Sequence, residues 1–98
     1  DTASSLVTRG LHSWQYGRVG MRARSDTRAG RWPAFWTLGR SGAWPRNGEV
    51  DIMEFYKGVL LANVAWGGAS GATWDSTRTP LTSLGDGWSS QFHVWRMD

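Results

Sequence analysis

NGEVDIMEF, Asn47–Phe55, holds three carboxylates within six positions and contains both glutamates of the chain, Glu49 and Glu54. The apolar residues between the acids favour β-structure and a glycine marks the entry, so this stretch is predicted to be a β-strand. Side chains alternate between the two faces of a strand. Glu49 and Asp51 therefore share one face, while Val50 between them points to the other.

Glu54 does not fit strict alternation, which would place its carboxylate among apolar side chains at a cost on the order of several kcal/mol. One extra residue at Ile52 or Met53 would remove the conflict. Such a β-bulge sets two residues opposite one and returns Glu54 to the face of Glu49 and Asp51. We therefore predict a bulged strand with a row of three carboxylates.

The row suits acid–base and nucleophilic chemistry. Alternate Cα atoms of a strand lie about 6–7 Å apart, so two long glutamate side chains can lean toward each other over a short aspartate. Retaining glycosidases need two carboxyl groups about 5–5.5 Å apart. The charge of Asp51 between the glutamates should raise at least one pKa of the coupled set. The simpler alternative is a solvated acidic strand face.

Four blocks of this sequence resemble glycoside hydrolase family 16, the laminarinase and lichenase family. GEVDIMEF (48–55), preceded by Trp44 and Pro45, is similar to the active-site signature of that family. The other three blocks follow the order of the family: YGRVGMRAR (16–24), GRWPAFWTLG (30–39) and FHVWRMD (92–98).

The resemblance implies roles for the three acids. Glu49 would be the nucleophile, Asp51 the assisting carboxylate and Glu54 the general acid and base. The extra Met53 is similar to the bulged branch of the family, which contains laminarinases and several galactan hydrolases.

Sugar contacts are expected from aromatic and polar residues near the row. The chain has eight tryptophans, more than a core of this size needs, and flat indole faces suit pyranose rings. Trp44 is the preferred platform because its loop leads into the acidic strand, and Trp36 and Trp32 are further candidates. By resemblance, Arg22 matches a sugar-contacting position on the concave face, and Asn63 matches a sugar-contacting asparagine of some members.

Alternation and turn residues predict the remaining elements. Gly67–Trp88 is predicted to be a long variable loop, His93 a hydrogen-bonded structural residue, and no helix pattern is present. Further strands are predicted at Ser4–Thr8, Tyr16–Ser25, Trp32–Leu38, Val59–Trp66 and Gln91–Asp98.

The chain has 98 residues, enough for one domain at most, whereas a family-16 sandwich is longer. We therefore expect residues 1–98 to be the central part of a catalytic domain, and expect this part to be inactive by itself. The expected fold is all-β, a concanavalin A-like jelly-roll sandwich of two antiparallel sheets, incomplete in this chain.

Eleven basic residues against eight acids give a net charge of +3. The arginines are scattered and no recognition helix is present, which argues against nucleic acid. No apolar run is long enough to span a membrane. The chain has no cysteine, and its two histidines are distant in sequence, so neither a metal site nor another cofactor is expected.

The sequence thus predicts a retaining endo-hydrolase of β-glucan with β-1,3 or mixed β-1,3-1,4 linkages. Its substrate lies outside cells, so an extracellular or periplasmic location is expected, with the full domain a monomer. Two alternatives remain: a hydrolase of a galactan such as agar or carrageenan, and a non-catalytic glycan-binding module on the same fold.

Overall fold

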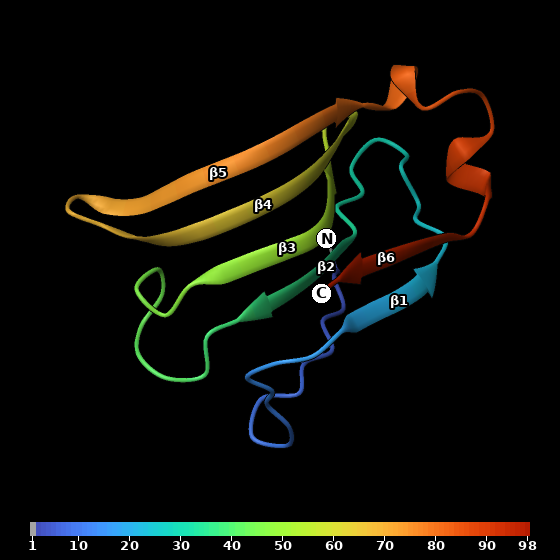
Figure 1. Cartoon of the computed structure of the whole chain (residues 1–98). Coiled ribbons are helices and arrows are strands. Elements are labelled where there is room, and N and C mark those ends of the chain that lie inside the picture. The colour runs from blue at the N-terminus through green and yellow to red at the C-terminus, as the bar shows by residue number, and fades with distance from the viewer. Residues whose placement is uncertain (1) are drawn as a thin grey trace.

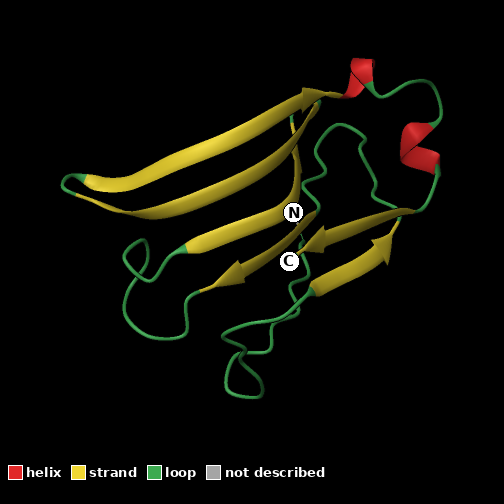
Figure 2. Cartoon of the chain, viewed as in Figure 1, coloured by secondary structure: helices red, strands yellow, loops and turns green. Residues whose placement is uncertain are grey.

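A four-stranded and a two-stranded antiparallel sheet make up the computed structural model, which describes residues 2–98 (Figure 1). The larger sheet has the strand order β2 (Ala34–Leu38), β3 (Glu49–Tyr56), β4 (Val59–Gly68) and β5 (Gly71–Pro80). The smaller sheet pairs β1 (Val19–Ala23) with β6 (His93–Met97), and β6 lies against β3. Two short 3-10 helices, η1 (Leu81–Ser83) and η2 (Trp88–Ser90), connect β5 to β6, and the described residues contain no α-helix (Figure 2).

A tight turn joins the acidic strand to its neighbour. Lys57 and Gly58 both have positive φ, 47° and 80°, and Tyr56 pairs with Val59 on either side of them. Two residues of this conformation match the twist of a β-hairpin. The predicted strand after this turn is confirmed as β4, which extends to Gly68.

The predicted β-bulge is present in β3. On the β4 side, Asp51 pairs with Asn63 and Glu54 pairs with Leu61, so β3 uses one more residue than β4 over this interval. On the β2 side, the successive residues 35 and 36 pair with residues 53 and 51. Ile52 is therefore the extra residue, and Glu54 returns to the face of Asp51.

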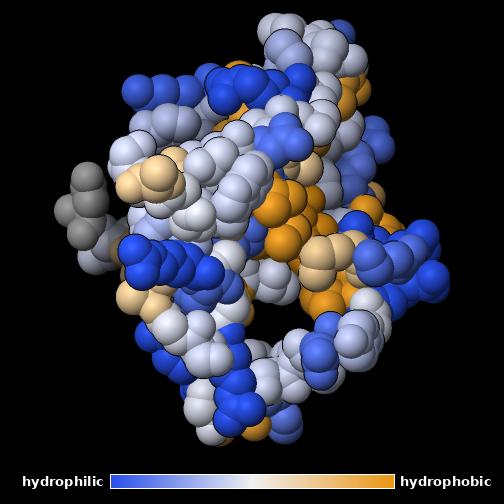
Figure 3. Space-filling model, turned by 60° about the vertical axis from the view of Figure 1, so that its left-hand side comes forward, coloured by the Kyte–Doolittle hydropathy of each residue, from blue (hydrophilic) through white to orange (hydrophobic). Residues whose placement is uncertain are grey.

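The buried core is small. Its apolar members are Met53 and Phe55 of β3 with Leu61 and Ala65 of β4. Many other apolar side chains are exposed, and Figure 3 shows several of them gathered around an opening in the surface. Exposed apolar surface of this kind favours association.

Two predictions of secondary structure are wrong. Ser4–Thr8 forms no strand, because its residues are exposed and pair with no neighbouring strand. Gly67–Trp88 is not one long loop: Gly71–Pro80 is β5, which pairs with β4 along its length through a turn at residues 69 and 70. β5 is polar and almost entirely exposed, so it lacks the apolar pattern by which a half-buried strand is recognised.

Candidate active site

Glu49, Asp51 and Glu54 lie together on one face of the larger sheet, as predicted. Paired residues of antiparallel strands share a face, and on β4 these acids pair with Ala65, Asn63 and Leu61 in that order. All three acids line one open hollow of about 530 Å³. The bulge is therefore what brings the third carboxylate to this hollow.

The hollow has aromatic and apolar walls. Trp36 of β2 and Trp32, just before β2, both line it. The face of β2 that carries Trp36 is therefore the face that meets the carboxylates. Met21 and Ala23 of β1 contribute the facing wall. Alternation in the sequence left open which face of β2 meets the acids, and the pairing of Trp36 with Asp51 decides it.

Each glutamate accepts a hydrogen bond from an indole. Trp44 Nε1 donates to Glu49 Oε2 at 2.7 Å, and Trp32 Nε1 donates to Glu54 Oε1 at 2.6 Å. The two tryptophans remain 50% and 62% exposed. Trp32 also packs against Tyr56, with ring centroids 4.4 Å apart. The exposed part of each indole can contact a ligand while its N–H group orients an acid.

The loop that carries Trp44 is tied down by its own hydrogen bonds. Asn47 Nδ2 donates to the carbonyl of Gly39 at 2.9 Å, and the backbone N–H of Gly39 donates to the carbonyl of Gly48 at 3.0 Å. A Cβ at Gly39 would lie 1.7 Å from the carbonyl oxygen of Asn47, so only glycine permits this approach. The closed loop therefore holds Trp44 beside Glu49.

Asn63 lies beside the row on β4, on the same face of the sheet, and does not line the hollow. Its Nδ2 donates to Asp51 Oδ2 at 2.9 Å and to Glu54 Oε2 at 2.7 Å. Asn63 and Asp51 are each 5% exposed. The expected sugar contact of Asn63 is therefore not what this structure shows: the amide is occupied by two carboxylates.

Partial burial raises the pKa of Glu49, and the negative charges of Asp51 and Glu54 raise it further against the opposing hydrogen bond from Trp44. This agrees with the expectation that one pKa of the set is raised. The raised pKa belongs to the glutamate that is expected to be the nucleophile. Glu49 therefore needs a higher pH than an ordinary glutamate to become ionised.

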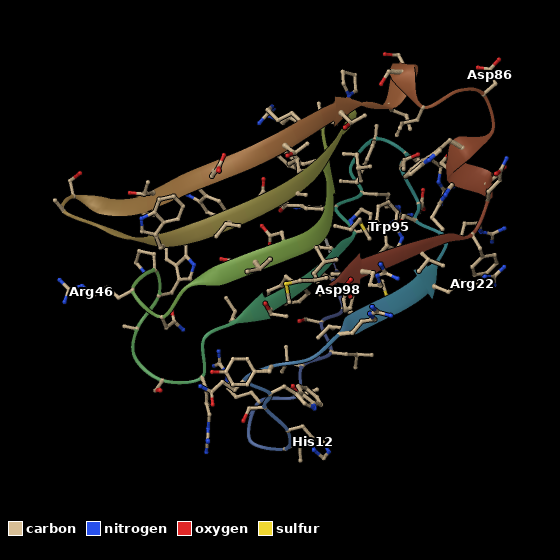
Figure 4. The ribbon with its side chains drawn as sticks, viewed as in Figure 1. His12, Arg22, Arg46, Asp86, Trp95 and Asp98 are labelled. Atoms are coloured by element: carbon tan, nitrogen blue, oxygen red, sulfur yellow. The ribbon has the colours of Figure 1, made fainter. Side chains whose placement is uncertain are left out.

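Arg22 does not reach the carboxylates. Its guanidinium lies over the ring of Phe92, with Cζ 4.5 Å from the centroid, and its side chain is exposed (Figure 4). Because Met21 and Ala23 line the hollow, alternation directs Arg22 to the opposite face of β1. The expectation that Arg22 belongs to the sugar-contacting face is thus corrected.

Trp74 is not among the predicted site residues, because it lies in the segment predicted to be a loop, Gly67–Trp88, which instead contains β5. Trp74 pairs with Ala65, which pairs with Glu49, so it lies on the carboxylate face. Its ring centroid is 6.2 Å from that of Trp44, at an interplanar angle of 52°, and the residue is 48% exposed. Its signal in the sequence is the set of strand-favouring threonines Thr73, Thr77 and Thr79, which alternate with Trp74, Ser76 and Arg78.

His93 has the structural role that was expected. Its Nε2 donates to the carbonyl of Trp88 at 2.8 Å, and the two rings stack with centroids 4.3 Å apart. Over residues 2–98, no group of three or more His, Cys, Asp or Glu is arranged to hold a metal ion. In the same residues, no helix is long and apolar enough to cross a membrane.

Known proteins resemble this chain in sequence. Residues 20–91 match the model of the XgeA-like, catalytic GH16 domain. A β-glucanase of Rhodothermus marinus is 52% identical over 58 residues, which cover 54% of this chain and 20% of that protein. A β-1,3-glucan-binding protein of Penaeus monodon is 30% identical over 110 residues, 99% of this chain and 30% of that protein.

A solved structure shows the same fold. The laminarinase catalytic domain from Thermotoga maritima MSB8 superposes with a TM-score of 0.68 at 26% identity, over 91% of this chain and 38% of that one. The predicted all-β class, two antiparallel sheets of a jelly-roll sandwich, is thereby confirmed. The chain spans well under half the length of each of these relatives.

Proposed function

Since this chain belongs to glycoside hydrolase family 16, we propose that the protein is a retaining endo-hydrolase of β-glucan with β-1,3 or mixed β-1,3-1,4 linkages. One observation carries the proposal. Two glutamates and an aspartate lie on one face beside an open hollow, and exposed indoles hold both glutamates. The similarity to a β-glucanase and to a laminarinase structure supports the substrate class.

The proposed mechanism is double displacement, and the placement of the three acids on one face supports it. Glu49 attacks the anomeric carbon while Glu54 protonates the leaving glycosidic oxygen, which gives a glycosyl enzyme and a shortened chain. Glu54 then removes a proton from water, and the water oxygen displaces Glu49 with overall retention. Asp51 lies between them and adjusts their protonation through its charge. Trp32, Trp36 and Trp44 offer ring faces for the sugar units.

Residues 1–98 are, in this proposal, the central part of a longer catalytic domain. The relatives are several times longer than the matched region, and many apolar side chains of this chain are exposed. We expect the complete domain to act as a monomer, outside the cell or in the periplasm, where polysaccharides are found. Activity recovered with the cells instead of the medium or periplasmic extract would contradict this location.

The test uses the complete domain and proton NMR of the first products from laminarin and mixed-linkage glucan. Retention releases the β anomer first, and release of the α anomer first would end the proposal. The Glu54→Ala variant should still be glycosylated by a substrate with a good leaving group, and azide should restore turnover as a β-glycosyl azide. An α-glycosyl azide would mean that the two glutamates have exchanged roles.

A second function is favoured by the likeness to the Penaeus monodon β-1,3-glucan-binding protein, which extends over 99% of this chain. The protein would then bind glucan without cleaving it. Two measurements on the complete domain separate the functions. Calorimetric binding of laminarin-derived oligosaccharides with no released reducing ends would favour the binding module. Agar and carrageenan belong in the substrate panel, because turnover of these alone would identify a galactan hydrolase.

A further inference from the structure

We propose that Asn63 is a positioning residue: its neutral amide ties Asp51 to Glu54 and determines through which oxygen Glu54 exchanges its proton. This inference rests on the proposed function, since it assigns the amide a part in the acid–base step. The geometry points to it directly. One nitrogen, Nδ2, donates both of its protons to the row, to Asp51 Oδ2 at 2.9 Å and to Glu54 Oε2 at 2.7 Å.

The fold places this amide beside the acids and largely away from solvent. Asn63 pairs with Asp51 across β3 and β4, so their side chains share a face. The residue is 5% exposed and does not line the hollow, whereas Asp51 and Glu54 do. Buried polar groups are costly without partners, and here the partners are the two carboxylates.

The chemistry of the acids dictates which end of the amide faces them. An asparagine side chain has two N–H donors on nitrogen and only acceptor positions on oxygen. If the amide were turned over, its oxygen would meet two carboxylate oxygens with no proton among the three. The carboxylates therefore orient the amide, and the amide in turn fixes the separation between Asp51 and Glu54.

The two oxygens of Glu54 are held on different sides. Oε2 accepts from buried Asn63, while Oε1 accepts from Trp32, which lines the hollow and is 62% exposed. Oε1 is therefore the oxygen that gives its proton to the glycosidic oxygen and later takes one from water. Asn63 keeps Oε2 in place through both steps.

A neutral donor suits this task. Hydrogen bonds to an ionised carboxylate favour the ionised form, but an amide carries no net charge and leaves protonation accessible. A lysine or arginine in its place would hold the acid ionised and stop the first step. The charged groups nearest the amide are Asp51 and Glu54, with Glu49 farther along β3. The neighbouring elements add others, which are Asp75 and Arg78 on β5, Arg96 on β6, and Arg24 and Asp26 in the lining of the hollow.

The first test compares Asn63→Ala with Ser76→Ala in the complete domain. Ser76 pairs with Asn63 on β5 and is exposed, so it is a matched control expected to stay within about twofold of wild type. Asn63→Ala should lower kcat by about 10- to 100-fold with KM nearly unchanged. Without this donor the ionised acid is less stable, so the alkaline limb of the rate profile moves to higher pH. A raised KM with an unmoved limb would identify a sugar contact and overturn the proposal.

The second test needs no substrate and therefore decides the role of Asn63 even if the proposed hydrolysis fails. Asn63→Asp keeps the shape but replaces both donors by a carboxylate facing two others. The folded variant must bind a proton that the unfolded chain releases more easily, so its stability falls as pH rises. The deficit in Tm against wild type should grow between about pH 4 and about pH 8. A deficit that is the same at every pH would overturn the tie to the row.

Discussion

The acids of β3 and the side chain of Asp26 are all tied down by hydrogen bonds, but the donors differ in charge. Asp26 accepts from Arg28 at 2.6 Å and lies 3.2 Å from Nε of Arg31, and the hydrogen bonds from Arg28 hold its pKa far below the usual range. The row instead accepts from indole and amide groups, and the pKa of Glu49 is raised. Arginine holds a carboxylate in one protonation state, whereas neutral donors fix its position and leave its proton free to move.

The largest expected effect comes from removing a carboxylate that is held by neutral groups. Glu49→Ala should lower kcat on β-glucan by about 10⁴-fold or more, because the glycosyl enzyme cannot form. Asp98 accepts a hydrogen bond from Arg18, forms an ion pair with Arg96, and does not line the hollow. Asp98→Asn is therefore the control, expected within about twofold of wild type. Equal losses in both variants would show that the kind of donor does not mark the functional acids.

A cation placed in the row should make it behave like the Asp26 site. Trp32→Arg puts a positive charge beside Glu54, which favours the ionised acid, and kcat/KM should fall about 100- to 1000-fold. The alkaline limb of the rate profile should move to lower pH. Trp32→Phe keeps an aromatic ring without the donor or the charge and should lose about 10-fold. If steady-state kinetics give the same profile for both variants, the charge of the donor is unimportant.

A smaller effect should appear in stability against pH. The folded protein holds the proton of Glu49 more tightly than the unfolded chain, in which the pKa of this glutamate is near 4.5. The protonated side chain therefore contributes to the free energy of unfolding at low pH, and this contribution is lost as pH rises through the higher folded pKa. Glu49→Gln should remove this pH dependence of the free energy of unfolding. The change should be less than about 1 kcal/mol, because water screens a partly exposed group. Urea unfolding of both proteins at several pH values measures it. An unchanged slope would contradict the raised pKa.

The smallest effect, of opposite sign, is expected at Asp26. Its folded pKa is lowered from 3.8, so its contribution is present above that value and is lost as pH falls. Asp26→Asn should therefore make the protein less sensitive to acid and leave stability at neutral pH almost unchanged, because the site is exposed. Thermal melts across the acid range test this, and a variant more sensitive to acid than wild type would refute it.

Much of the acidic strand was predictable because charge and alternation conflict there in a way that has one solution. A carboxylate at Glu54 cannot lie in an apolar layer, so a bulge was required, and Ile52 provides it. The neighbours of the row were less predictable. Alternation specifies which residues of a strand share a face. It does not specify which face of β2 meets the acids, because that depends on pairing between strands.

The errors have physical causes. β5 has polar residues on both faces because it is exposed along its length, and strand preference there comes from pairing with β4. The glycines near its turn also read as a loop. Asn63 was assigned to sugar because the sequence cannot show that its amide is occupied by Asp51 and Glu54.

The register of the two sheets has a consequence for the order of folding. The row and its donors lie between Trp32 and Asn63, on β2, β3, β4 and the loops between them, whereas β1 pairs with β6 from near the other end of the chain. Short loops close faster and at a lower entropic cost than long ones. We expect pulse-labelled amides of β3 and β4 to gain protection before those of β1 and β6, and the reverse order would contradict this. The acids would then reach their working arrangement on a partly folded chain, before β1 supplies the facing wall of the hollow.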